Sequence, residues 1–112
     1  MATNKADLRT ERRIAQARRG TLTFAEITVP CVIQDFSTTG FLIMCSKPFP
    51  AGTVMDLKSE LYPNEVLTCK IEVRHTTDMC LGTKIVEISN PAARLCQRFI
   101  EEFYSERLKF GR

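Results

Sequence analysis

Apolar and polar residues alternate strictly along the segment Leu67–Arg74, and this pattern restricts the possible folds more than any other feature of the sequence. Leu67, Cys69, Ile71 and Val73 occupy every second position, with Thr, Lys, Glu and Arg between them. A period of two is typical of an antiparallel β-strand that has one face in the core and the other in water. We therefore expect these four side chains to face inward together.

Five other segments have the length and composition of short strands and are bounded by turn residues. They are Thr21–Glu26, Val29–Gln34, Phe41–Cys45, Val54–Leu61 and Leu81–Ile88. The first two are expected to form a hairpin, and the longer turns contain Pro48, Pro50, Gly52 and Pro63. Short strands at this spacing are typical of a closed barrel or a sandwich, and we predict a six-stranded antiparallel β-barrel.

A C-terminal α-helix is predicted over residues 90–109. Asn90 is the expected N-cap, and Pro91 suits the first helical position. An apolar stripe at helical spacing follows, made of Leu95, Cys96, Phe99, Ile100 and Phe103. We expect this stripe to pack on the barrel, with a partner-binding role for the outer turns near Tyr104 and Leu108 as the alternative.

The 112 residues, 44% of them hydrophobic, are enough for one domain with a single core. No apolar run has the length of a membrane span, and the N-terminus is charged, so we expect no membrane insertion and a cytoplasmic location. The sequence shows no catalytic motif, and we expect no enzymatic activity.

Five cysteines are widely spaced along the chain: Cys31, Cys45, Cys69, Cys80 and Cys96. No two form a Cys-x-x-Cys pair, and the sequence has a single histidine, His75. Zinc sites usually need closely spaced ligand pairs, so no metal is expected. The odd number also argues against a disulfide framework, and most of these thiols are predicted to be small buried hydrophobic groups.

Basic residues are concentrated in residues 1–20, where five arginines and one lysine face two acidic residues. The rest of the chain has ten basic and eleven acidic residues, so its net charge is −1. We predict a flexible arginine-rich arm over 1–20 and a barrel with its helix over 21–112. Such an arm is either a solvated tail or an anion-binding segment, and arginine favours the second because guanidinium groups bind phosphate and guanine bidentately.

Two motifs stand out when they are taken together. Arg9-Thr-Glu-Arg-Arg13 contains two arginines four residues apart, and Asp35-Phe-Ser37-Thr-Thr-Gly40 begins 22 residues later. Alone, the second motif predicts a turn in which Asp and Ser cap backbone amides and Gly40 adopts a positive φ. The combination resembles the signature of the PilZ domain family, and the resemblance extends over nearly the whole chain.

This resemblance implies a receptor for the bacterial second messenger cyclic di-GMP. Such a receptor has no cofactor and relays the signal to a protein effector in motility, pilus, biofilm or exopolysaccharide control. Its ligand-binding residues would be Arg9, Arg12, Arg13, Asp35, Ser37 and Gly40. We favour Arg9 and Arg13 as the arginine pair, with Arg12 and Arg18 as substitutes.

The chemistry of these side chains suits such a ligand. Arginine donates bidentately to guanine O6 and N7, and a carboxylate such as that of Asp35 accepts from the guanine N1–H and amine. Ser37 offers a hydroxyl, and Gly40 lets the backbone approach closely.

Two other functions remain open. A PilZ-like adaptor would bind protein partners without nucleotide. A barrel that binds single-stranded nucleic acid would need exposed aromatic platforms, which the apolar-patterned phenylalanines do not supply, so no DNA or RNA partner is expected. We expect a monomer or a weak dimer.

Overall fold

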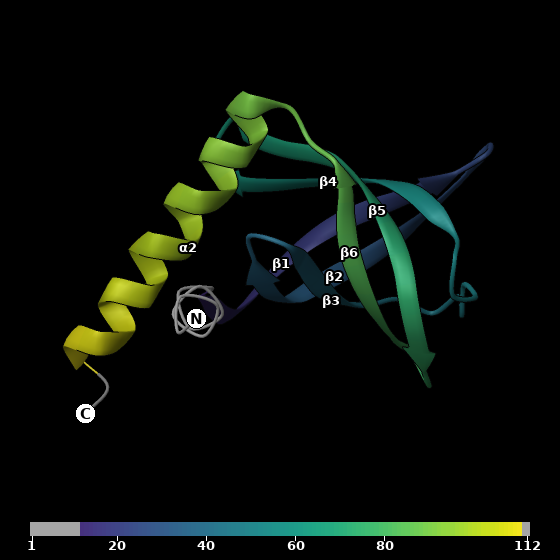
Figure 1. Cartoon of the computed structure of the whole chain (residues 1–112), viewed down its shortest axis with the longest axis horizontal. Helices are drawn as coiled ribbons and strands as arrows, with labels where there is room; N and C mark the ends of the chain where they lie inside the picture. The colour runs from purple at the N-terminus through teal and green to yellow at the C-terminus, as the bar shows by residue number, and fades with distance from the viewer. Residues whose placement is uncertain (1–11, 111–112) are drawn as a thin grey trace, which may run out of the picture.

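The computed structural model describes residues 12–110, which form six strands and one helix (Figure 1). In chain order they are β1 (Arg13–Phe24), β2 (Ile27–Ser37), β3 (Gly40–Met44), β4 (Val54–Tyr62), β5 (Glu65–Thr77), β6 (Cys80–Glu87) and α2 (Asn90–Phe110). The strands make a closed antiparallel barrel in the order β1-β2-β3-β6-β5-β4. The predicted fold class, a six-stranded antiparallel barrel followed by a C-terminal helix, is therefore confirmed.

The barrel core contains the alternating residues of β5, as expected. Leu67, Ile71 and Val73 are fully buried, and Cys69 is 7% exposed. Pairing between β1 and β4, from Gly20 opposite Ser59 to Thr23 opposite Asp56, closes the barrel. These two strands therefore do not present open edges there.

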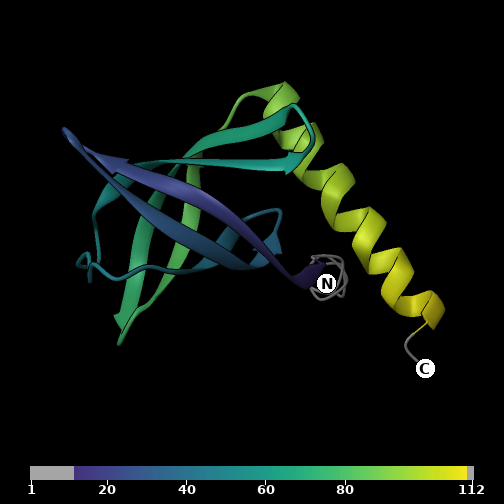
Figure 2. The same ribbon diagram turned by 180° about the vertical axis from the view of Figure 1, so that it is seen from behind.

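The helix α2 packs against one end of the barrel, and the views in Figures 1 and 2 both show it running past the start of β1. Its Phe99 ring lies 4.8 Å from the Phe36 ring of β2 and 5.7 Å from the Tyr62 ring of β4, measured between ring centres. Phe99 and Ile100 are buried, which confirms that the apolar stripe packs on the barrel.

The helix begins at Asn90, as predicted, but its N-cap is Ser89 and not Asn90. Ser89 is the N-cap, because its hydroxyl oxygen accepts a hydrogen bond from the Ala92 amide at 3.2 Å and its carbonyl accepts from Ala93 at 2.9 Å. Asn90 is then the first helical residue and Pro91 the second. Proline is tolerated there because its missing N–H would have no partner within the helix.

Residues 13–20 of the predicted arm are not a flexible segment. Residues 13–20 belong to β1, which pairs with β2 from Arg13 opposite Ser37 to Phe24 opposite Ile27. A register shift between Ala15 and Arg18 interrupts the alternation in this stretch, which hides the strand in the sequence. Residues 1–11, which include Arg9, lie outside the described part of the chain.

No helix in the described part of the chain is long and apolar enough to cross a membrane.

Candidate ligand-binding site

The motif Asp35-x-Ser37-x-x-Gly40 forms the tight turn between β2 and β3. The Ser37 hydroxyl accepts hydrogen bonds from the amides of Thr39 at 3.2 Å and Gly40 at 3.1 Å. It donates to the Gly40 carbonyl at 2.9 Å, and the side chain is fully buried. A hydroxyl has one donor and two acceptor positions, so all of them are used within the turn. Ser37 therefore fixes the backbone that follows Asp35.

Gly40 is required by the close approach of two strands. A Cβ atom at this position would overlap the Thr83 carbonyl oxygen of β6 and lie 3.1 Å from the Lys84 Cα. Its φ is not positive, contrary to the sequence-based expectation, and among the described glycines only Gly52 has a positive φ. Glycine is needed here because β3 and β6 pair at this point with no space for a side chain.

Asp35 faces the outside of the barrel because a β-bulge precedes it. Cys31 and Ile33 are buried, so strict alternation would direct Asp35 into the core as well. The pairing of β2 with β3 shifts between Ile33 and Asp35, and the next buried residue is Phe36. The extra residue, Gln34, reverses the phase of the strand and leaves the half-buried Asp35 on the outer wall.

Arg13 and Asp35 line the same depression on the outer wall of the barrel. Arg13 starts β1 opposite Ser37, and Ala15 lies opposite Asp35. The depression has a volume of about 230 Å³, and its lining is completed by Phe41, Leu42, Arg74, His75, Gly82 and Thr83. The structure thus brings together one arginine of the first motif and the aspartate of the second.

Six lining residues were not predicted as site residues. Phe41 and Leu42 directly follow the second motif, whereas the other four are distant from both motifs: Arg74, His75, Gly82 and Thr83. These four belong to β5 and β6, and their place at the site depends on the strand order. Leu42 of β3 pairs with Gly82, which in turn pairs with His75. No local motif marks these residues, so only the sheet register could have identified them.

The remaining candidate arginines of the described chain contact α2 instead. The Arg12 guanidinium lies 4.7 Å from the centre of the Tyr104 ring and lines a separate depression with Thr38 and Glu101. The Arg18 guanidinium lies 4.9 Å from the centre of the Phe99 ring, and its Nε donates to the Leu61 carbonyl at 3.4 Å. Cation–π contacts of this kind stabilise the junction of helix and barrel.

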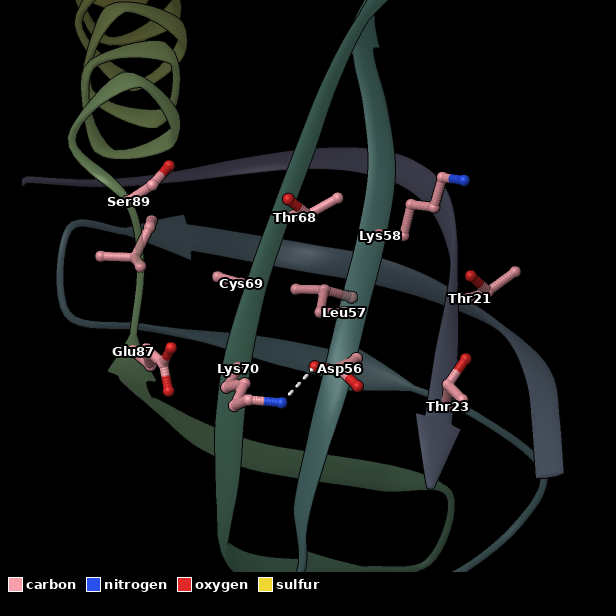
Figure 3. Close-up of a pocket in the computed structure, with 11 residues that line it drawn as sticks. Thr21, Thr23, Asp56, Leu57, Lys58, Thr68, Cys69, Lys70, Glu87 and Ser89 are labelled. Atoms are coloured by element: carbon pink, nitrogen blue, oxygen red, sulfur yellow. Dashed lines mark hydrogen bonds and ion pairs between the residues drawn. The ribbon is translucent and has the colours of Figure 1, made fainter. Parts of the chain in front are cut away.

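Another depression lies over β1, β4 and β5 and shares no lining residue with the first. In Figure 3, Lys70 of β5 points toward Asp56 of β4, and their ion pair measures 2.8 Å. Glu87 and Lys58 lie at its margins. Both partners of the ion pair are about half-exposed, so it contributes little to stability.

The cysteines are mainly core residues, as predicted. Cys31, Cys45, Cys69 and Cys96 are buried, and Cys80 is half-buried. Burial raises the pKa of Cys31 and Cys69 to about 12 and that of Cys96 to about 11. These three thiols therefore stay protonated and unreactive at neutral pH. Within residues 12–110, no three His, Cys, Asp or Glu side chains are grouped so as to hold a metal ion.

Fold and site together define a small β-barrel domain with a polar site on its outer wall, beside the β2–β3 turn. The model of the PilZ domain family matches residues 7–102, so the chain belongs to this family. A comparison with curated protein sequences gives no match.

Three solved structures show the same fold at low sequence identity. The inhibitor of motility MotI/DgrA from Bacillus subtilis has a TM-score of 0.74 and 13% identity over 88% of this chain and 51% of its own. The PilZ domain of YcgR from Escherichia coli, solved with c-di-GMP, has a TM-score of 0.69 and 16% identity, covering 89% and 95%. The PilZ domain of CeSA from a cellulose-synthesizing bacterium has a TM-score of 0.68 and 16% sequence identity, over 82% of this chain and 97% of its own. The chain thus spans about half the length of MotI/DgrA and nearly all of the two PilZ domains.

Proposed function

We propose that this protein is a cytoplasmic receptor for cyclic di-GMP, without catalytic activity of its own, that relays the signal to a protein partner. Membership of the PilZ family supports this function, as does the E. coli YcgR PilZ domain, whose structure holds c-di-GMP. The observation that carries the proposal is the shared depression of Arg13 and Asp35. These residues are 22 positions apart in sequence and come from the two motifs.

The two side chains offer complementary recognition of a guanine nucleotide. The Arg13 guanidinium would donate to guanine O6 and N7 or to a phosphate, and the Asp35 carboxylate would accept from the N1–H and the amine. Ser37 and Gly40 would contribute indirectly, because they hold the turn that presents Asp35.

The arm would complete the site. The depression is smaller than the volume of about 300–1,000 Å³ that small-molecule sites usually have. Arg9, four residues before Arg13, would reach the ligand from the arm, which would become ordered over it on binding. Ordering of the arm would then be the signal that an effector in motility, pilus, biofilm or exopolysaccharide control detects.

Calorimetric titration with cyclic di-GMP tests this proposal. Asp35→Ala should weaken binding about five- to a hundredfold, which corresponds to the loss of one bidentate contact of about 1–3 kcal/mol. Asp56→Ala is the matched control, because Asp56 lines the other depression, where it forms the ion pair with Lys70. Equal affinities of the two variants would contradict the proposed site.

A non-nucleotide adaptor is the second candidate. Arg12 and Arg18 favour this function because their guanidinium groups contact aromatic rings of α2. Of these three neighbouring arginines, Arg13 is then the one that lines the depression and could bind a nucleotide there. If the unmodified protein shows no binding at high-micromolar cyclic di-GMP, the adaptor function replaces the receptor function.

A further inference from the structure

The imidazole of His75 lies directly on Gly82 in the depression that Arg13 and Asp35 line. A Cβ atom at Gly82 would overlap the ring atoms Cε1 and Nε2 of His75 and lie 2.9 Å from Nδ1. The ring therefore occupies the space that any other residue at position 82 would fill. Glycine here gives the imidazole a flat surface against the wall of the barrel.

A second β-bulge directs His75 to this place. Ile71 and Val73 are buried, so strict alternation would direct the next odd-numbered residue, His75, inward. The pairing of β5 with β6 shifts between Val73, opposite Thr83, and His75, opposite Gly82. As a result both Arg74 and His75 are exposed on the outer wall. Bulges of this kind often reorient side chains next to functional sites.

Charged groups surround His75 from several strands. Arg13 of β1, Asp35 of β2 and Arg74 of β5 line the depression with it. Glu72 of β5 lies further along the same strand, and its Oε2 is 3.9 Å from the Nη1 of Arg74. Lys84 of β6 is opposite Glu72 in the strand register. The third strand, β3, contributes no charged residue. Around the depression itself, two arginines and one imidazole thus face a single carboxylate, which favours a ligand that carries phosphates.

We propose that His75 is a further ligand-binding residue of this site, that it contacts a phosphate of the cyclic dinucleotide, and that ligand binding is coupled to uptake of a proton by its imidazole. The inference rests on the proposed function. A neutral imidazole has one N–H donor, whereas the protonated ring has two donors and a positive charge. Histidine is the side chain that changes charge between pH 5 and 8, and the arginines keep theirs. Affinity should therefore rise as the pH falls.

Titration of tag-free protein with cyclic di-GMP between pH 5.5 and 8.5 tests this coupling. His75 is the only histidine in the sequence, but the α-amino group also changes charge in this range, so the variant His75→Gln is needed to assign the proton uptake. We expect affinity to increase about tenfold from the alkaline to the acidic end, the value of one charge-assisted hydrogen bond of about 1.4 kcal/mol. In His75→Gln, affinity should stay at the alkaline value at every pH.

A spectroscopic measurement separates ligand contact from a structural effect of the substitution. The single imidazole Cε1–H resonance should change its chemical shift when cyclic di-GMP is added, because a bound phosphate would lie against the ring. Thr77→Ala, at an exposed position two residues further along β5, is the matched control and should keep the pH dependence.

The outcomes distinguish this inference from the proposed function. If the unmodified protein binds cyclic di-GMP and Asp35→Ala weakens binding, but His75→Gln matches the unmodified protein at every pH, His75 is not a ligand contact and the receptor function stands. If the unmodified protein binds no cyclic di-GMP from pH 5.5 to 8.5, both are overturned.

Discussion

The guanidinium of Arg12 lies 4.7 Å from the centre of the Tyr104 ring on α2, whereas the next residue, Arg13, lines the depression that contains Asp35. Two consecutive arginines at the start of β1 thus serve different parts of the molecule, the helix and the outer wall. Any movement of this short segment would change both contacts together. The barrel site and the helix are therefore linked through the backbone of residues 12 and 13.

This division predicts opposite effects for two neighbouring substitutions. Arg12→Ala removes a cation–π contact and should lower the free energy of unfolding by about 0.5–1 kcal/mol, while cyclic di-GMP affinity is kept. Arg13→Ala should weaken binding about five- to a hundredfold and leave the barrel folded. Urea unfolding and calorimetry on both variants give the comparison. Loss of binding in Arg12→Ala alone would show that the arginines are assigned to the wrong sites.

The N-cap of α2 gives a second pair of adjacent variants. Ser89→Ala removes the acceptor for the Ala92 amide and should destabilise the protein by about 0.5–2 kcal/mol. Asn90→Ala should change stability by less than about 0.5 kcal/mol, because this side chain is exposed within the first turn. Chemical denaturation distinguishes them, and a larger loss for Asn90→Ala would restore it as the cap.

Gly40→Ala should destabilise the barrel by about 1–3 kcal/mol or more, since the added methyl group overlaps the backbone of β6. Thr38→Ala, an exposed position in the same turn, should stay within about 0.5 kcal/mol of the unmodified protein. Thermal unfolding monitored by circular dichroism measures both. Equal melting temperatures for the two variants would mean that β3 and β6 have space for a side chain.

The buried thiols predict a loss of stability at alkaline pH. In the unfolded chain a thiol ionises near pH 9, whereas Cys31 and Cys69 keep their protons to a pKa of about 12 in the fold. The folded state therefore binds more protons between these values. The stabilisation is fully present below pH 9 and declines as the pH rises toward 12. Urea unfolding at pH 8 and pH 10 should show the decline, and it should be smaller in the double variant Cys31→Ala, Cys69→Ala.

Much of the fold could be predicted from the sequence because local periodicity determines it. The alternation of Leu67, Cys69, Ile71 and Val73 predicts the central strand and its buried face, and all four are buried. The apolar stripe of the helix predicts its packing face in the same way. Both elements follow from side-chain spacing alone, which needs no knowledge of distant strands.

The start of β1 and the helix cap were predicted less well, for local reasons. The register shift between Ala15 and Arg18 disrupts the period of two, and the adjacent charges of Arg18 and Arg19 resemble a solvated segment. Ser89 and Asn90 are both good N-caps, and only the hydrogen bond to Ala92 distinguishes them.

The sequence by itself determined the strands apart from the start of β1, and it also determined the helix, the family motifs and the choice of Arg13 and Asp35 as candidate ligand residues. The tertiary structure decided which outer-wall residues accompany them. By alternation from their buried neighbours, Asp35 and His75 would both point into the core, and the bulges at Gln34 and Arg74 turn them outward. In a bulge, two residues of one strand are opposite a single residue of the partner strand. The pairing register of the closed barrel decides where this happens, and the sequence of one strand does not contain that information.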